Sequence, residues 1–294
     1  MGFLYSLDRV RRGAIPTLSA FAVLRDAITA ELRAASPAIV AGSVYGSSVR
    51  GDVSVRSDMD LFLVYETAER NRVSQMLRRL DDQARAAHIS LHASIHSVDA
   101  AAQTDRYGPS FLQTWERMRT AGLLVGEPER YYRALFPYDV RSEMSHKIQR
   151  YLGKVRRQHR QFANARRSSG WLGRQLEQWY AQSVRPAHVY VNVARWLLLW
   201  RDGTLRDDGK YAVVRRVLAS NEFAAIHETL EIVRDLDSGY NRFLQQVRRG
   251  SISGKAYNRR VRVLLDILMP ANVFLLTEAH RLTAGNPCSL VVAA

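Results

Sequence analysis

The spacing of apolar residues changes along the chain and divides it into two parts. In the first part, three segments repeat apolar residues at helical spacing and carry charged residues on the opposite face, which predicts amphipathic helices. These segments are residues 16–36, 68–87 and 109–120. Two short apolar runs predict buried strands, and a strict alternation of polar and apolar residues predicts a strand with one buried face. These strands are residues 38–45, 60–65 and 88–97.

From about residue 137 the strand patterns stop and only helical spacing remains. Four segments carry this spacing and are separated by turns that contain glycine: residues 144–165, 172–200, 222–247 and 255–282. The second part is therefore expected to be a bundle of four or five helices. Together the patterns predict an α+β domain with a small mixed sheet over residues 1–135, followed by an all-α helical bundle over residues 136–294.

The charge of the chain follows the same division. Lys and Arg total 43 and Asp and Glu total 28, which gives a formal net charge of +15. Residues 1–140 hold 17 basic and 16 acidic residues, whereas residues 141–294 hold 26 and 12, so the second part carries almost the whole excess. Such an excess favours a polyanionic partner, most simply RNA or DNA. Two basic clusters have almost no acids beside them: Lys147, Arg150, Lys154, Arg156, Arg157, Arg160, Arg166 and Arg167, and then Arg248, Arg249, Lys255, Arg259, Arg260 and Arg262.

Composition excludes several classes of protein. Hydrophobic residues make up 47% of the chain and charged residues 24%, which is typical of a globular protein and not of a disordered one. Cys288 is the single cysteine, so an intrachain disulfide and a zinc site built from cysteines are excluded. Neither a signal peptide nor a run long enough to cross a bilayer is present, so we expect a soluble, cytoplasmic protein with no membrane partner.

Residues 45–64 carry the pattern that indicates chemistry. The first predicted strand ends at Gly46-Ser47, where a small residue allows backbone amides to approach a phosphate closely. Asp58 and Asp60 begin the second strand two residues apart, and the period of a strand places both carboxylates on one face. Two carboxylate ligands on one face suit Mg²⁺, which binds proteins through one or two carboxylates together with substrate phosphates. The segment therefore predicts a phosphate site beside a metal site, as nucleotidyl transfer requires.

This segment resembles the signature of the minimal nucleotidyltransferase superfamily, whose members have a polymerase-beta-like fold. Gly46-Ser47, ten further residues, Asp58-Met59-Asp60 and the apolar residues 61–64 fit that signature, as do Arg50-Gly51 and Ser57. The resemblance covers roughly residues 15–130, and the layout is similar to that of small bacterial members with a helical C-terminal domain, such as aminoglycoside nucleotidyltransferases. Residues 111–126 resemble the helix and turn that follow the third strand in such members.

The resemblance implies roles for these residues. Ser47 and the backbone of Gly46 would hold the phosphates of ATP or another NTP, with Arg50 and Ser57 beside them. Asp58 and Asp60 would bind Mg²⁺, in a site for two ions. Family members usually add a third carboxylate on the next strand, as a metal ligand or as the base. Here that polar face holds only His and Ser, and His92 occupies the best position, so an imidazole base is expected in its place.

Several functions are compatible with these features. The first is transfer of NMP, with AMP from ATP as the expected case, to a hydroxyl of RNA such as tRNA, because the bundle is basic. The second is modification of an antibiotic of the aminoglycoside type, whose cationic substrates would need an acidic lining. The third is a non-catalytic nucleotide- or RNA-binding protein, or a toxin–antitoxin partner, that kept the fold and lost the third carboxylate. Transfer of NMP to a protein hydroxyl is a further variant, and the sequence leaves the oligomeric state open.

Overall fold

The computed structural model describes residues 4–101, 122–126, 140–167, 186–205, 209–249 and 252–284. The elements that precede residue 127 are α1 (Leu7–Arg11), α2 (Leu18–Ala34), β1 (Ile39–Tyr45), α3 (Ser47–Arg50), β2 (Asp58–Tyr65), η1 (Thr67–Glu69), α4 (Arg70–Ala86), β3 (Ser90–Ser97), α5 (Val98–Ala101) and β4 (Gly122–Gly126). The later elements are α8 (Val140–Arg167), η4 (Pro186–His188), α10 (Val189–Asp202), α11 (Lys210–Leu218), η5 (Asn221–Ile226), α12 (His227–Arg249) and α13 (Gly254–Ala284).

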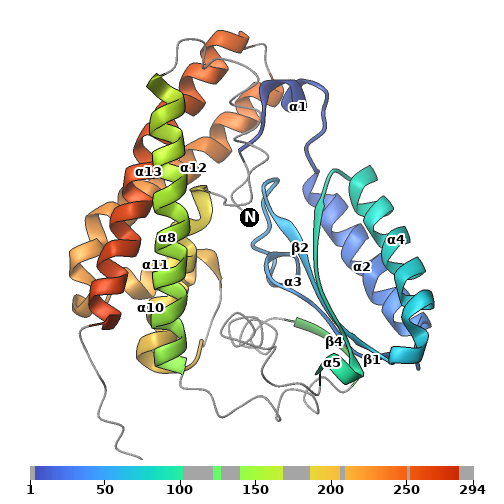
Figure 1. Ribbon diagram of the computed structural model, residues 1–294. Helices are drawn as coiled ribbons and strands as arrows, with labels where there is room; N and C mark the ends of the chain where they lie inside the picture. Colours follow the sequence, from blue (N-terminus) through green and yellow to red (C-terminus); the bar gives the residue numbers. More distant parts are fainter. Residues whose placement is uncertain are drawn as a thin grey trace, which may run out of the picture.

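The strands form one mixed sheet in the order β3-β2-β1-β4. β1 is antiparallel to both β2 and β4, whereas β2 and β3 are parallel. Parallel neighbours need a crossover connection, and α4 supplies it between β2 and β3. The predicted α+β class with a small mixed sheet followed by helices is therefore confirmed (Figure 1).

Two helices cover one face of this sheet. α2 begins at its N-cap Thr17, whose hydroxyl accepts a hydrogen bond from the Ala20 amide, and it buries an apolar stripe. α4 buries a second stripe, and both pack on the face of β2 that carries Met59, Leu61 and Leu63. Because side chains alternate along a strand, Asp58 and Asp60 lie on the opposite face. In Figure 1, α2 and α4 lie on the side of the sheet away from the helical bundle, so the aspartates face the bundle.

A second core holds the helical bundle together. α10 lies at its centre, since every residue from Val189 to Trp200 except Asn192 is buried, as expected of a helix covered on all sides. α8, α11, α12 and α13 contribute the rest of this core. α13 is one helix with Pro270 inside it.

Residues 4–15 belong to this second core although they precede the sheet in sequence. Leu4, Leu7 and Ile15 are buried within it. The Tyr5 amide donates to the Tyr240 hydroxyl at 3.0 Å, and α1 contacts α12 and α13. We therefore call residues 4–15 together with the described residues from 140 onward the helical lobe, and residues 16–101 with 122–126 the sheet lobe. The predicted division near residue 135 stays a prediction, because residues 127–139 lie outside the described ones.

Several expectations differ from the structure. Residues 122–126 form strand β4 beside β1, so the predicted turn there is wrong and the sheet has a fourth strand. The strand predicted within residues 88–97 is confirmed as β3, but its apolar face is only partly buried: Ile89 lies in the core, whereas Ala93 and Ile95 are exposed on this edge strand. The sequence did not predict α11 as a separate helix. The helix expected over residues 109–120 lies outside the described residues, as do residues 172–185 of the helix expected over residues 172–200.

Within the described part of the chain, no helix combines the length and the apolar character needed to cross a membrane.

Candidate functional site

The predicted site residues meet at one end of three neighbouring strands. Tyr45 at the end of β1 pairs with Asp60 of β2, and Asp60 pairs with His92 of β3. Gly46 and Ser47 follow directly after Tyr45. The sheet thus brings the Gly-Ser pair, the aspartate pair and His92 to the same end, with Asp60 on the strand between the other two.

Asp58, Asp60 and His92 form a set of ligands that fits a divalent cation. One ligand atom from each residue lies within 4.8 Å of those from the other two. Both aspartates are 5% exposed, so they are held in a largely buried position on the strand. Carboxylate oxygens are the preferred ligands of Mg²⁺, and an added imidazole also suits Mn²⁺ or Zn²⁺. The donor set therefore fits the predicted Mg²⁺, and Asp58 and Asp60 are the residues that would hold it.

His92 stands at the solvent side of this set. Its side chain is 68% exposed, and its Nδ1 lies 3.9 Å from Asp60 Oδ1, which is beyond hydrogen-bonding distance. The parallel register of β2 and β3 places it opposite Asp60, where the family resemblance predicts a third carboxylate. Farther along the same face, the Ser94 hydroxyl lies 2.9 Å from His96 Nε2, and burial lowers the pKa of His96.

Gly46 and Ser47 form a tight turn between β1 and α3. Gly46 has φ 84° and ψ −154°, a conformation that only glycine adopts at low cost. Ser47 and Ser48 are buried, and their hydroxyl oxygens have no hydrogen-bond partner among the described residues. Buried hydroxyl groups are usually paired, so two unpaired ones beside a carboxylate pair fit a polar ligand such as phosphate. The first amides of a helix also have no partner within it.

Arg50 and Ser57 have partners within the loop that follows α3. Arg50 forms an ion pair with Asp52, with Nη2 at 3.1 Å from Oδ1, and only 8% of its side chain is exposed. The Ser57 hydroxyl accepts a hydrogen bond from the Ser54 amide at 2.9 Å and so closes the turn before β2. These contacts explain why both residues are positioned beside the site, while their contact with a nucleotide stays a prediction.

Arg56 has a structural role that the sequence did not indicate. Its Nη1 donates to Asp237 Oδ1 at 2.7 Å and to Asn241 Oδ1 at 3.1 Å, both on α12. Its guanidinium lies 4.7 Å from the centre of the Tyr240 ring. Its position two residues before Asp58 would also suit a contact with the triphosphate, but the structure places it against the helical lobe. No local pattern indicates such a pair, because 181 residues separate Arg56 from Asp237.

A histidine of the helical lobe lies near the aspartates. Burial, together with the positive charges of Arg195 and Lys210, holds the pKa of His188 well below its usual value, and the Asp58 carboxylate opposes this shift. His188 is therefore neutral at pH 7, and the Asp58 carboxylate is near enough to influence its pKa. No sequence pattern indicated this residue, because it stands alone at the start of α10.

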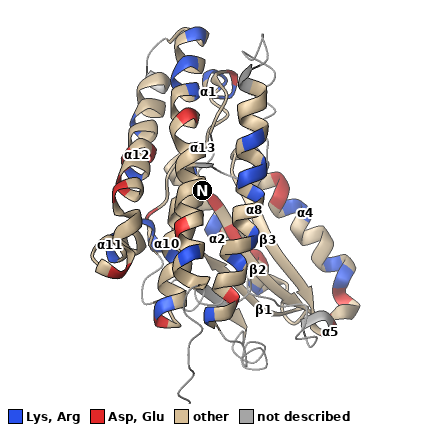
Figure 2. Cartoon of the chain, turned by 60° about the vertical axis from the view of Figure 1, so that its left-hand side comes forward, with Lys and Arg blue, Asp and Glu red and all other residues tan. Residues whose placement is uncertain are grey.

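The helical lobe also exposes basic side chains. Arg150, Arg156, Arg157 and Arg160 are exposed on α8, and Figure 2 shows basic residues along much of this helix. Lys255, Arg259, Arg260 and Arg262 are exposed on the first turns of α13. Arg166, Arg167, Arg248 and Arg249 belong to the predicted clusters, but their side chains lie outside the described ones.

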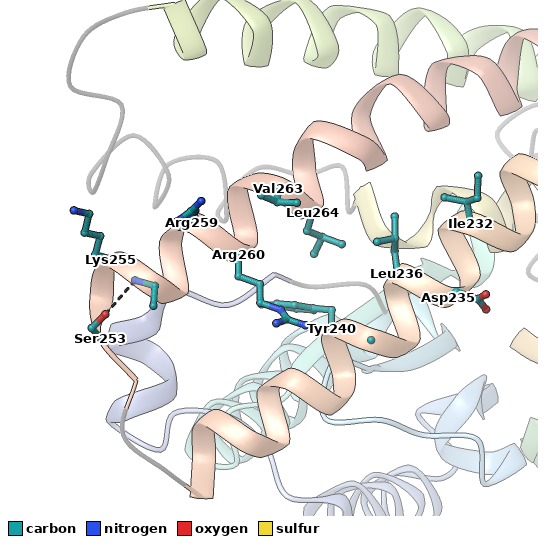
Figure 3. A pocket seen from close by; sticks show the side chains of 12 residues that line it. Ile232, Asp235, Leu236, Tyr240, Ser253, Lys255, Arg259, Arg260, Val263 and Leu264 are labelled. Atoms are coloured by element: carbon teal, nitrogen blue, oxygen red, sulfur yellow. Dashed lines mark hydrogen bonds between the residues drawn. The ribbon is translucent and has the colours of Figure 1, made fainter.

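A cavity of about 940 Å³ lies between α12 and α13 (Figure 3). Its lining is mainly apolar, with Leu236, Val263 and Leu264 among the contributors, and Lys255 and Arg259 stand at one end. The residues predicted as site residues do not line it. Tyr240 lines the cavity and also lies beside the Arg56 guanidinium.

Neither a comparison with protein-family models nor a search of the curated proteins found a match for this sequence.

Proposed function

We propose that the protein is a Mg²⁺-dependent nucleotidyltransferase of the polymerase-beta-like fold, which transfers NMP from an NTP, AMP from ATP in the expected case, to a hydroxyl of RNA such as tRNA. The observation that carries this proposal is the meeting of Asp58, Asp60 and His92 within 4.8 Å, at the same end of the sheet as the buried Ser47 hydroxyl. Metal-assisted phosphoryl transfer needs carboxylates that hold the metal and, close to them, groups that bind the phosphates.

Each residue has a defined part in this reaction. Asp58 and Asp60 hold the metal, which neutralises the triphosphate charge and makes the acceptor hydroxyl more acidic when it is bound. Ser47 and the amides that follow Gly46 bind the β- and γ-phosphates. The acceptor oxygen forms a bond to the α-phosphorus, the bond from the α-phosphorus to the bridging oxygen breaks, and pyrophosphate leaves. The proton of the acceptor hydroxyl passes to the imidazole of His92, whose exposure allows its release to water.

The exposed arginines of α8 and α13 support RNA as the acceptor. Arg150, Arg157 and Arg160 are exposed on one helix, and Glu143 is the only acid within α8. Arginine side chains bind the phosphate backbone of nucleic acids without reading its sequence. A cationic antibiotic would be repelled by this surface, so the RNA acceptor is favoured over an aminoglycoside.

A second candidate is a nucleotide- or RNA-binding protein that does not catalyse transfer. The observation that favours it is that β3 presents an imidazole opposite Asp60 where a carboxylate is expected. In that case the aspartates would still bind metal and nucleotide, but no label would reach the acceptor.

The test is transfer of label from each of the four α-³²P-labelled NTPs to total RNA or to purified tRNA in the presence of Mg²⁺. The proposal expects labelled RNA with the wild type, and a loss of at least about 100-fold for Asp58→Asn or Asp60→Asn. Asp26→Asn serves as the control, because Asp26 is an exposed acid on α2. Metal-dependent nucleotide binding without any transfer to RNA would favour the second candidate, and transfer to protein or antibiotic alone would reject the RNA acceptor.

A further inference from the structure

A buried group of polar and charged side chains joins the two lobes next to the candidate site. We call Arg56, Asp237, Lys210, Tyr190 and Asn241 the inter-lobe cluster. Asp237 of α12 is at its centre: Oδ1 accepts from Arg56 at 2.7 Å, and Oδ2 accepts from the Tyr190 hydroxyl at 3.0 Å and from Lys210. The side chains of Arg56 and Asp237 are 2% and 1% exposed.

The loop between α3 and β2 is attached to the helical lobe at three points. Asp52 Oδ2 accepts a hydrogen bond from the Lys210 amide at 3.1 Å. The carbonyl of Val55 accepts from the Tyr5 hydroxyl at 2.8 Å. Arg56 forms the third and most buried contact. This loop leads directly into Asp58, so the helical lobe holds the backbone immediately before the metal-binding pair.

Charge balance makes the Asp237 contact strong. Burial disfavours the ionised form of Asp237, but the positive charges and hydrogen bonds of Arg56 and Lys210 outweigh it, so the pKa of Asp237 lies below its usual value. Burial and the Asp237 charge raise the pKa of Tyr190 well above its usual value, so its hydroxyl stays protonated and donates. Asp237 therefore remains ionised with three donors around it over the neutral pH range.

A buried ion pair contributes little net stability compared with apolar packing, and its better-attested role is to specify one arrangement. Arg56 lies two residues before Asp58 and four before Asp60. Only a short stretch of backbone separates them, so a shift of Arg56 also shifts the two aspartates. Groups that orient metal ligands from outside the coordination sphere typically change metal affinity by about 10- to 100-fold when they are removed.

We propose that Arg56 and Asp237 are positioning residues, through which the helical lobe holds Asp58 and Asp60 in the arrangement that binds metal. The metal-binding half of this statement rests on the proposed function. The contact makes the sheet lobe dependent on the helical lobe for its metal site, so the two lobes act as one unit.

The test measures Mn²⁺ affinity of the full chain by calorimetry for wild type, Arg56→Met and Asp237→Asn. Both variants are expected to bind Mn²⁺ at least about 10-fold more weakly than the wild type. The double variant should bind Mn²⁺ no more weakly than the single variant with the lower affinity, because both changes break the same contact. Arg56→Lys keeps the charge and should lose less affinity. Asp202→Asn is the matched control, since Asp202 also pairs with two cations, Arg201 and Arg216, but within the helical lobe.

Folded variants that bind Mn²⁺ with wild-type affinity would overturn the proposal. A similar loss of affinity in the Asp202→Asn control would overturn it too, since the effect would then be one of general destabilisation. If Arg56→Met does not fold, Asp237→Asn decides the question by the same criterion.

Failure of the proposed function is recognised separately. If the wild type binds neither Mn²⁺ nor Mg²⁺, the metal site is rejected. The positioning role is then tested by the rate of amide hydrogen exchange at Met59–Phe62. Faster exchange there in Arg56→Met, with unchanged exchange in Asp202→Asn, supports positioning of β2 by the helical lobe, whereas unchanged exchange in Arg56→Met overturns it.

Discussion

Asp60→Asn should abolish stabilisation by Mg²⁺ while leaving the metal-free protein as stable as the wild type or more so. The ligand oxygens of Asp58 and Asp60 lie within 4.8 Å, so two ionised carboxylates repel each other by at least about 3.5 kcal/mol at an effective dielectric constant of about 20. Removing one charge relieves this repulsion. An acid that served only the fold would show the opposite result, because its loss would destabilise the metal-free protein.

The size of the metal effect follows from mass action. A ligand that binds only the folded state stabilises it by about 2.7 kcal/mol when its free concentration is 100 times Kd. For a chain of this size that corresponds to a rise in Tm on the order of 5 °C. Asp60→Asn should lose this rise, whereas Asp26→Asn, which changes an exposed acid on α2, should keep it.

The assay is thermal unfolding followed by circular dichroism, with EDTA and with a series of Mg²⁺ concentrations at constant ionic strength. Constant ionic strength is needed because added salt alone weakens repulsion between basic side chains. The reasoning is refuted if the wild type shows no rise in Tm at saturating Mg²⁺, or if Asp60→Asn shows the same rise.

Three further predictions concern other parts of the molecule. Gly46→Ala should destabilise the protein by about 1–3 kcal/mol in urea denaturation, because φ 84° and ψ −154° strain any other residue, whereas Gly153→Ala in α8, with open space around it, should not destabilise. Because the pKa of His188 is lowered in the folded protein, the unfolded chain protonates this histidine at a higher pH than the folded protein does. The free energy of unfolding should therefore fall as pH drops below about 6.5, and thermal melts between pH 5 and 8 should show a weaker pH dependence for His188→Gln. Arg157→Gln with Arg160→Gln should reduce the slope of log K for tRNA against log salt by about 0.7 for each phosphate that the variant no longer neutralises, and an unchanged slope in filter binding would place the RNA elsewhere.

The sequence predicted that the residues at the centre of the candidate site lie together, because that part depends on local periodicity. A strand has a period of two, so Asp58 and Asp60 had to share a face wherever the strand lay. The alternation over residues 88–97 likewise placed His92 on a polar face. The structure brings these three residues together at one end of the sheet.

Other features had no local signal. β4 is a five-residue run bounded by glycines, and such a short apolar run has too few residues to show a period, so its sequence predicts a turn as readily as a strand. The exposure of Ala93 and Ile95 depends on β3 being an edge strand, which the order of strands decides. Residues 4–15 read as an extension of the first domain, yet their apolar side chains are buried in the helical lobe.

The residues of the candidate site could therefore be predicted from a short stretch of sequence, whereas the link between the lobes could not. Gly46-Ser47 and Asp58-Met59-Asp60 carry information because their spacing is fixed by the backbone over a few residues. Arg56 and Asp237 are 181 residues apart and look like two ordinary surface charges in the sequence. Only the folded chain shows that both are buried and paired, because burial and the neighbours of a charge are set by long-range packing and not by the residues beside it.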